Sequence, residues 1–350
     1  MDQCAPAHGP VRPGAVGNRM ARLPALLALL LAACTPVVMP AGPRIAAPAL
    51  AEDAVIAADG ARLPLRAYAP KHAPRAMLLA LHGFNDHSGS FLEDSIGALS
   101  EGGLLVYAYD QRGFGRSPNR GYWAGAETLA ADAAIAARLL RARHLDLPLF
   151  LMGESMGGAV AILAGSSAAP PPVDGYVLLA PALWGRASMN ALMRGGLWVA
   201  ARTMPILGFQ GGVGGIVASD NPAALRRLGR DPLVVRSTRV DAAIGLIDLM
   251  DEAVAALPAC CRTADGNAAP VLLLYGAKDM LIPARPVRAA LNALPPETPI
   301  RIGIHEAGFH LLLTDSNRDA VVRDLLAFIA DPAAPLPSGA DRFAPEWLAR

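Results

Sequence analysis

A serine flanked by glycines is the residue in this chain best placed for nucleophilic chemistry. The run Gly153-Glu154-Ser155-Met156-Gly157 has the form G-x-S-x-G, between an apolar stretch and a stretch of small residues. This order predicts a buried strand, a tight turn and a helix, the setting that pushes a serine hydroxyl out at the top of a sheet. We therefore predict that Ser155 is a nucleophile and that the amide of Met156 points towards an oxyanion. A chain with 34 glycines can produce this pattern by chance, so further residues must support it.

Two residues downstream of Ser155 are candidates to activate its hydroxyl. A serine needs an imidazole to take its proton and a carboxylate to orient that imidazole. Asp279 follows a predicted strand at 271–276, and His310 follows another at 300–304. The order serine, acid, histidine is one of those in which serine hydrolases arrange these groups. We therefore predict that Asp279 is the acid and His310 the base.

Other roles for these two residues stay open at this point. Asp279 could cap a helix or shape a turn, and His310 could be a packed histidine. His305 competes as the base, although it falls at a strand end rather than in a loop. His305-Glu306 also resembles the start of the zinc motif H-E-x-x-H, but His310 comes one residue too late to share a helix face with His305. We predict no metal site.

A loop earlier in the chain is the candidate for the second oxyanion donor. A predicted strand at 76–81 leads into His82-Gly83-Phe84-Asn85-Asp86-His87-Ser88-Gly89. Gly83 permits a sharp turn, and we predict that the amide of Phe84 is the donor. His82 and His87 precede the serine, which is the wrong order for a base, so we interpret them as structural hydrogen-bonding residues.

Four motifs together resemble those of monoacylglycerol lipases and their bacterial lysophospholipase-like relatives. They are the loop at 82–89, Asp110-Gln111-Arg112-Gly113-Phe114-Gly115-Arg116-Ser117, the turn at 153–158, and Asp231-Pro232-Leu233-Val234. The resemblance spans about residues 53–330, with the motifs in the family's order. The family often has Gly-Glu where this chain has Asn85-Asp86, and its lipases often have His where it has Glu154. These departures leave the choice of substrate open.

The resemblance implies a capped serine hydrolase acting on esters of glycerol and fatty acids. It assigns Ser155, Asp279 and His310 to a catalytic triad, and the Phe84 and Met156 amides to the oxyanion hole. It implies no cofactor, and substrates that are monoacylglycerols or lysophospholipids. A peptidase or acyltransferase on the same triad is an alternative, because a fold does not fix a substrate. A non-catalytic surface lipoprotein that retains the fold is another.

Composition and patterning are consistent with one α/β-hydrolase domain. The hydrophobic fraction of 53% predicts a sizeable core, and the net charge of +1 gives no indication of a nucleic-acid partner. Apolar runs alternate with helical patterns, which predicts a mostly parallel sheet with helices on both faces. The predicted core comprises residues 52–183 and 270–331, and 332–350 is predicted to be a loose tail.

The alternation stops between the two parts of the core. Residues 184–269 contain no predicted strand, and we interpret them as a helical cap. The cap is strongly apolar, and pockets for apolar ligands are lined mainly by such side chains. We predict that some of them line an acyl pocket, namely Trp198, Met204, Leu207 and Phe209.

The N-terminus is predicted to be a targeting segment. Residues 23–33 form an apolar run too short to span a bilayer, and residues 1–33 are interpreted as a signal peptide. Leu31-Ala32-Ala33-Cys34 resembles a bacterial lipobox, which implies lipidation of Cys34 and attachment to the periplasmic side of an envelope membrane. An ordinary signal peptide is the alternative. Residues 34–51 are then a Pro/Ala-rich tether, and the adjacent Cys260 and Cys261 are predicted to be free thiols.

Overall fold

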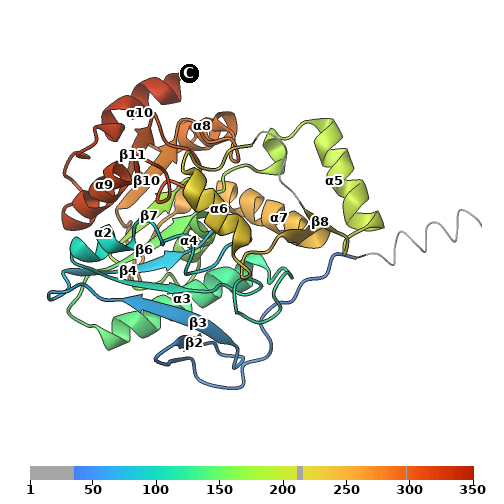
Figure 1. Ribbon diagram of the computed structural model, residues 1–350, viewed down its shortest axis with the longest axis horizontal. Coiled ribbons are helices and arrows are strands. Elements are labelled where there is room, and N and C mark those ends of the chain that lie inside the picture. The colour runs from blue at the N-terminus through green and yellow to red at the C-terminus, as the bar shows by residue number, and fades with distance from the viewer. Residues whose placement is uncertain (1–34, 211–215, 297) are drawn as a thin grey trace, which may run out of the picture.

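A sheet runs through the centre of the molecule (Figure 1). The computed structural model describes residues 35–210, 216–296 and 298–350, and within them this sheet has nine strands in the order β1-β2-β3-β5-β4-β6-β7-β10-β11. Pairing is antiparallel from β1 through β3 to β5 and parallel across the other strands. The predicted mostly parallel sheet is thus confirmed. The strands are β1 Ala49–Leu50, β2 Ala54–Ile56, β3 Arg62–Tyr68, β4 Ala76–Leu81, β5 Leu104–Tyr109, β6 Leu149–Glu154, β7 Gly175–Leu179, β10 Val271–Gly276 and β11 Ile300–His305.

The sheet is covered by helices on both faces. Apart from Glu154 at the end of β6, the central parallel strands have no charged residue, and they are buried on both sides, as expected where helices cover each face. The helices α3 (Ala126–Arg143), α4 (Met156–Ser166) and α8 (Ala284–Asn292) pack on one face. The helices α2 (Ile96–Glu101) and α9 (Arg318–Ala330) pack on the other. The carboxyl ends of β4, β6, β10 and β11 therefore meet at one edge, where open parallel sheets place their sites.

The end of the chain is a packed helix, and the predicted loose tail is wrong. Helix α10 (Ala340–Ala349) lies against β11 and α8 (Figure 1). Trp347 is fully buried and stacks against Tyr275, while Arg288 lies over its ring. The prolines before the helix direct the chain back over the edge of the sheet rather than leaving it free.

The segment predicted to be a tether also lies on the core. Val38 forms a parallel bridge with Trp123, and the Met39 amide donates to the Trp123 carbonyl at 2.7 Å. The Val37 amide donates to the Asp241 carboxylate at 3.2 Å. The described part of this segment is thus attached to the domain. The prediction of a tether is wrong in this respect, although most of the side chains are exposed. Cys34 and the predicted signal peptide lie outside the described residues.

The cap connects β7 to β10. It contains α5 (Ala191–Thr203), α6 (Pro222–Arg230) and α7 (Val240–Ala256), with short turns of 3₁₀ helix at Arg186–Ser188 and Leu257–Ala259. The prediction of a cap without strands is wrong, because β8 (Gly208–Gln210) pairs antiparallel with β9 (Ser237–Arg239). Each strand has only three residues, which is too short for a period of two to be recognised in the sequence. No helix in the part of the chain that the structure describes is long and apolar enough to cross a membrane.

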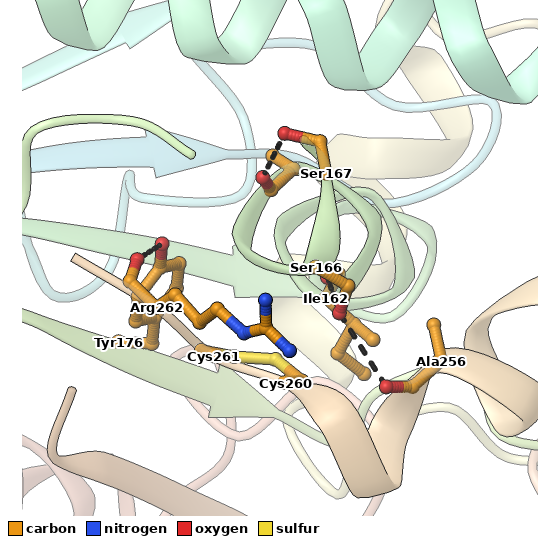
Figure 2. Close-up of a disulfide and its surroundings, with 9 residues drawn as sticks. Ile162, Ser166, Ser167, Tyr176, Ala256, Cys260, Cys261 and Arg262 are labelled. Atoms are coloured by element: carbon orange, nitrogen blue, oxygen red, sulfur yellow. Dashed lines mark hydrogen bonds between the residues drawn. A yellow bond between two sulfur atoms is a disulfide. The ribbon is translucent and has the colours of Figure 1, made fainter. Parts of the chain in front are cut away.

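Cys260 and Cys261 are joined by a disulfide rather than being free thiols (Figure 2). Both residues are buried, at the point where the chain leaves the cap. The next residue, Arg262, donates its amide to the carbonyl of Gly165 at 3.0 Å and accepts a hydrogen bond from the Tyr176 hydroxyl at 2.7 Å. The returning chain is thereby held against the end of α4 and the side of β7.

Candidate active site

Ser155 lies in the turn between β6 and α4, as the sequence pattern predicts. Its backbone adopts φ 53° and ψ −115°, a conformation that is rare for a residue with a side chain. The Ser155 amide donates to the carbonyl of Leu179 on β7 at 2.9 Å, and its carbonyl accepts from Ala182 at 3.0 Å. The surrounding hydrogen bonds hold the strained turn and present the serine at the carboxyl edge of the sheet.

The glycines around Ser155 are required by close backbone contacts. A Cβ atom at Gly153 would lie 2.1 Å from the carbonyl oxygen of Gly157, and one at Gly157 would lie 2.3 Å from that of Leu81. A Cβ atom at Gly158 would lie 2.9 Å from the side chain of Pro181. Strand, turn and helix therefore come together only where side chains are absent. This explains the motif sterically and strengthens its interpretation as a nucleophile turn.

Asp279 and His310 form a direct pair beside this turn. His310 Nδ1 lies 2.7 Å from Asp279 Oδ2, and both side chains are buried. The other carboxylate oxygen, Asp279 Oδ1, accepts the amides of Leu281 at 2.8 Å and Ile282 at 3.0 Å. The carboxylate is thus fixed by the backbone and oriented towards the imidazole. This arrangement keeps the proton on Nδ1 and leaves Nε2 to accept one.

The loop that carries His310 is attached to the cap. The carbonyl of Ala218 accepts the amides of His310 at 3.1 Å and Leu311 at 3.0 Å. Three residues further on, the Asn221 side chain donates to the carbonyl of Thr314 at 2.9 Å. The cap therefore contributes to the position of the histidine although it supplies none of the three predicted triad residues.

His305, the alternative base, faces another part of the molecule. Its Nε2 atom lies 3.1 Å from Asp324 Oδ2, and this pair is buried between β11 and α9. The interaction joins a strand to a covering helix, so we interpret His305 as a structural residue and not as the base.

Of the two predicted oxyanion donors, Met156 follows Ser155 in the chain and Phe84 lies in the loop after β4. Met156 begins α4, so its amide has no partner within the helix. In the described chain, neither this amide nor that of Phe84 donates a hydrogen bond to another protein group. A Cβ atom at Gly83 would lie 3.5 Å from that of Ser155, which places the loop after β4 directly against the serine. Both amides remain available to a ligand oxygen.

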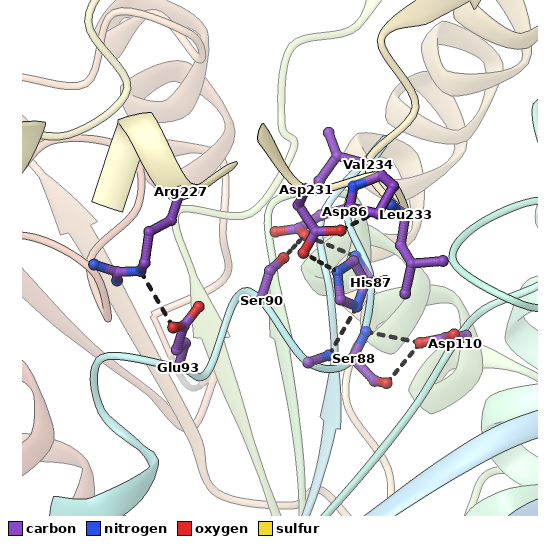
Figure 3. A network of polar contacts seen from close by, with 12 residues as sticks. Asp86, His87, Ser88, Ser90, Glu93, Asp110, Arg227, Asp231, Leu233 and Val234 are labelled. Atoms are coloured by element: carbon purple, nitrogen blue, oxygen red, sulfur yellow. Dashed lines mark hydrogen bonds and ion pairs between the residues drawn. The ribbon is translucent and has the colours of Figure 1, made fainter. Parts of the chain in front are cut away.

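His82 and His87 are structural, as predicted. His82 Nε2 accepts the Gln111 amide at 3.0 Å, which leaves Nδ1 to donate to the Gly83 carbonyl at 2.8 Å. Burial lowers the pKa of His82, so it remains neutral. His87 Nδ1 accepts the Gly89 amide, and Nε2 lies 2.9 Å from a carboxylate oxygen of Asp231 (Figure 3). His87 thus connects the oxyanion loop to the D-P-L-V segment of the cap.

Ser155 and His310 open into one cavity of about 950 Å³, which we call the central cavity. The loop after β4 forms one side of it, and the cap forms much of the rest. Its walls are mainly apolar, with a few polar groups beside Ser155, as in sites that bind apolar small molecules. The apolar side chains that line it are Phe84, Trp184, Ala218, Leu225, Leu228, Val234, Val235, Leu246, Met250, Leu281, Ile282 and Leu311.

Comparison with known proteins agrees with this geometry. The family model described as serine aminopeptidase, S33 (Hydrolase_4) matches residues 72–317. The chain belongs to this hydrolase family.

Proteins similar to this chain include lipases. A monoacylglycerol lipase of Mycolicibacterium smegmatis is 25% identical over 277 residues, which cover 77% of this chain and 93% of that protein. Monoglyceride lipase of Homo sapiens is 29% identical over 271 residues, covering 74% and 82% respectively. The crystal structure of Paleococcus ferrophilus monoacylglycerol lipase superposes with a TM-score of 0.58 at 25% identity, covering 76% of this chain and 98% of that one. These relatives place this S33-family hydrolase among monoacylglycerol lipase-like carboxylic ester hydrolases with an α/β-hydrolase fold.

The four cap residues predicted to line an acyl pocket do not line the central cavity of this hydrolase. The side chains of Trp198, Met204, Leu207 and Phe209 are each 44–57% exposed. Helix α5 has a single buried residue, Ala201, so most of its apolar residues face outwards. On β8, Gln210 lines the cavity, and neighbouring residues of a strand point to opposite sides, so Phe209 is directed away. The prediction was wrong because apolarity in the sequence does not show which side of the cap a residue occupies.

Sequence reasoning missed the residues that do line the cavity on the cap side. Leu246 and Met250 lie on α7 four residues apart, so they share one helix face. Trp184 comes directly after the core, and Val235 follows the D-P-L-V segment. The D-P-L-V motif, which resembles an element of the family's cap, was a sequence signal for this region, and its contact with the oxyanion loop became evident only from the fold.

Proposed function

We propose that this protein hydrolyses the carboxylic ester of monoacylglycerols or lysophospholipids through Ser155, His310 and Asp279. The observation that carries the proposal is the His310–Asp279 hydrogen bond beside a strained serine, with serine and histidine opening into the same apolar cavity. A free amide on each side of the serine supplies two hydrogen-bond donors for an oxyanion.

In the proposed acylation step, Ser155 Oγ forms a bond to the ester carbonyl carbon while its proton passes to His310 Nε2. The negative charge moves to the carbonyl oxygen, where the amides of Phe84 and Met156 stabilise it. Asp279 stabilises the imidazolium through Nδ1–H. The tetrahedral intermediate then expels the alcohol, which takes the proton from His310. Water attacks the acyl-enzyme in the same manner, with His310 again as the base, and releases the fatty acid.

The shape and lining of the central cavity support a lipid substrate. Its volume of about 950 Å³ lies within the range usual for small-molecule sites, and its walls are mainly apolar. Each buried methylene of an acyl chain contributes about 0.8 kcal/mol of binding free energy. The names of the relatives, monoacylglycerol and monoglyceride lipases, support the same substrate class.

Replacement of the nucleophile tests the proposal. Ser155→Ala should reduce hydrolysis of monoacylglycerols and p-nitrophenyl acyl esters on the order of 10⁶-fold. A fluorophosphonate probe should label the wild-type protein at Ser155 and leave the variant unlabelled. An unchanged thermal unfolding midpoint would show that the variant is folded. Ester turnover by the variant within tenfold of wild type would overturn the assignment, and absence of labelling in wild type would favour a non-catalytic lipoprotein.

The location of the protein is a separate proposal, which rests on the sequence. The run Leu31-Ala32-Ala33-Cys34 follows an apolar stretch, and we infer that lipidation at Cys34 attaches the domain to the periplasmic side of an envelope membrane. A singly acylated protein binds membranes only reversibly, so several chains are needed for stable anchoring. Metabolic labelling with a fatty-acid probe should tag wild type and fail to tag Cys34→Ser. Lack of labelling in wild type would reject lipidation.

A further inference from the structure

One carboxyl oxygen of Glu154 has no hydrogen-bond partner in the described chain, although the residue is almost completely buried. Glu154 ends β6, directly before Ser155, and is 1% exposed. Its Oε2 atom makes no hydrogen bond within the described chain. The residue lines the central cavity and also an adjoining side pocket of about 30 Å³, large enough for about one water molecule. A buried polar group without a partner is costly, so its occurrence beside a reactive serine points to a ligand.

No cation within the described residues neutralises Glu154. Burial raises its pKa well above the usual range, and the nearby carboxylates of Asp86, Asp315 and Asp279 raise it further. Asp86 also lines both the central cavity and the side pocket, and burial raises its pKa as well. The two carboxyl groups together form an acidic end of the central cavity.

The cationic side chains around this acidic end are engaged elsewhere. Arg227 also lines the side pocket, but its guanidinium pairs with the Asp94 carboxylate at 2.5 Å and with Glu93 at 3.2 Å, and in Figure 3 it points towards Glu93. His87 is hydrogen-bonded to Asp231. Arg236, which lines the central cavity, donates to the Asp231 carbonyl at 3.2 Å. None of these three cationic or ionisable side chains pairs with Glu154 or Asp86.

We propose that Glu154 and Asp86 form a subsite that binds a positively charged ammonium group of the substrate. A cation placed there would ionise Glu154 and supply the charge that both carboxylates lack, whereas an anionic group would be repelled. Glu154 and Ser155 line the same cavity, so one molecule reaches the subsite and the serine together. The inference rests on the proposed ester hydrolysis. It adds that Glu154 determines which esters are preferred.

The ammonium group has two possible sources, and matched esters distinguish them. Octanoylcholine carries the charge on its alcohol part, and 3,3-dimethylbutyl octanoate is its neutral isostere. L-leucine ethyl ester carries the charge on its acyl part, and ethyl 4-methylpentanoate is the neutral counterpart. We would measure kcat/KM for each pair in wild type and Glu154→Gln, which keeps the shape and removes the ionisable group. Glu93→Gln is the control, because Glu93 already has Arg227 as a partner.

In wild type, the charged member of at least one pair should be hydrolysed with a kcat/KM at least tenfold above that of the neutral one. In Glu154→Gln this ratio should fall to about one. Because both esters are measured on the same protein, a general loss of activity in the variant would leave the ratio unaffected. Glu93→Gln should keep the wild-type ratio. Which pair shows the preference identifies the source of the charge. A ratio of one for both pairs in wild type would overturn the subsite and leave ester hydrolysis intact, as would a preference that persists in Glu154→Gln.

A binding measurement tests the subsite without turnover. Calorimetry should show octyltrimethylammonium binding to wild type at least tenfold more tightly than to Glu154→Gln, while 1-octanol binds both equally. Should no ester be hydrolysed, the proposed function would fail, and this titration would still decide the subsite. Equal binding of octyltrimethylammonium to both proteins would overturn it.

Discussion

Asp279 holds His310 through one carboxylate oxygen and is itself held by the backbone through the other. The Nδ1–Oδ2 distance is 2.7 Å, while Oδ1 accepts the amides of Leu281 and Ile282. A carboxylate fixed at both oxygens specifies the orientation of the ring and the nitrogen that carries the proton. The pair is therefore suited to present Nε2 to a hydroxyl, which is the role proposed for it with Ser155.

Asp279→Asn should impair turnover severely while preserving the fold. The amide keeps the size of the side chain but fails to stabilise the imidazolium and favours the wrong tautomer. By analogy with other triads, kcat should fall on the order of 10⁴-fold. The control is Asp265→Asn, an exposed carboxylate in a distant loop, which should leave kcat unchanged. Full activity in Asp279→Asn would show that another residue is the acid.

Gly157→Ala should destabilise the fold, because its Cβ would lie 2.3 Å from the Leu81 carbonyl oxygen. The Cβ atom is bonded directly to the backbone of α4 and the oxygen belongs to the backbone of β4, so neither moves without distorting the turn. We expect a loss of about 3 kcal/mol in the free energy of unfolding, the upper range for overpacking.

Gly195 on α5 provides a matched control for that substitution. Nothing lies within 4 Å of a Cβ atom at this position. Gly195→Ala should therefore stabilise the protein by about 1 kcal/mol through helix propensity. Urea denaturation of the two variants should show a lower free energy of unfolding for Gly157→Ala and a higher one for Gly195→Ala. Equal effects would show that the close approach at Gly157 is not maintained in solution.

Asp59 should make stability depend on acid pH. Arg112 hydrogen-bonds to it at 2.7 and 2.8 Å, and this contact holds the pKa of Asp59 well below its usual range. The native carboxylate thus stays ionised at pH values where the unfolded one, with a pKa of about 3.9, takes up a proton. Its stabilising contribution is full above that pH and is lost as the pH falls further.

Asp59→Asn should accordingly cost about 2 kcal/mol at pH 7, the usual contribution of a hydrogen bond to a charged group. The difference from wild type should shrink as the pH falls from 4 towards 2. Chemical denaturation at pH 7, 4 and 3 measures it. A difference that grew on acidification would contradict the direction of the pKa change.

The core and the candidate triad could be predicted from the sequence because each depends on a local pattern of residues. The runs at 149–152 and 271–275 are apolar throughout, which is typical of strands buried on both faces. The G-x-S-x-G turn reflects contacts between neighbouring backbones, and the order of Asp279 and His310 followed from the strands before them. The structure pairs Asp279 with His310 and places His310 and Ser155 on the same cavity, while their catalytic roles stay a prediction.

The packing of the cap and of the C-terminal segment was harder to predict from the sequence, because it depends on residues that are far away along the chain. Trp347 lies in a segment with several prolines, and its burial depends on Tyr275 and Arg288, which are far away in sequence. In α5, apolar residues such as Trp198 face outwards, because the helix packs mainly against α7 along one side. Glu154 stood out as a departure from the family pattern, yet its lack of a partner became evident only from the fold.

The last prediction concerns acyl-chain selectivity, which we assign to the inner face of the cap. Leu246 on α7 lines the central cavity, whereas Leu207 and Phe209 are about half exposed and do not. Leu246→Trp should fill space that a long acyl chain would occupy. Loss of contact with two methylenes corresponds to about 1.6 kcal/mol, slightly more than tenfold in kcat/KM. Hydrolysis of palmitoyl and octanoyl esters should therefore fall at least tenfold relative to the acetyl ester, which is too short to reach α7.

Leu207→Asp and Phe209→Ala should leave the relative kcat/KM values of the three esters unchanged, because these side chains lie outside the cavity. Comparing the four proteins on acetyl, octanoyl and palmitoyl esters separates the two faces of the cap. If the outer variants changed the selectivity and Leu246→Trp did not, the acyl chain would occupy a different path from the central cavity. Because the acetyl ester serves as an internal standard, a general loss of folded protein in any variant would lower all three values together and leave the ratios intact.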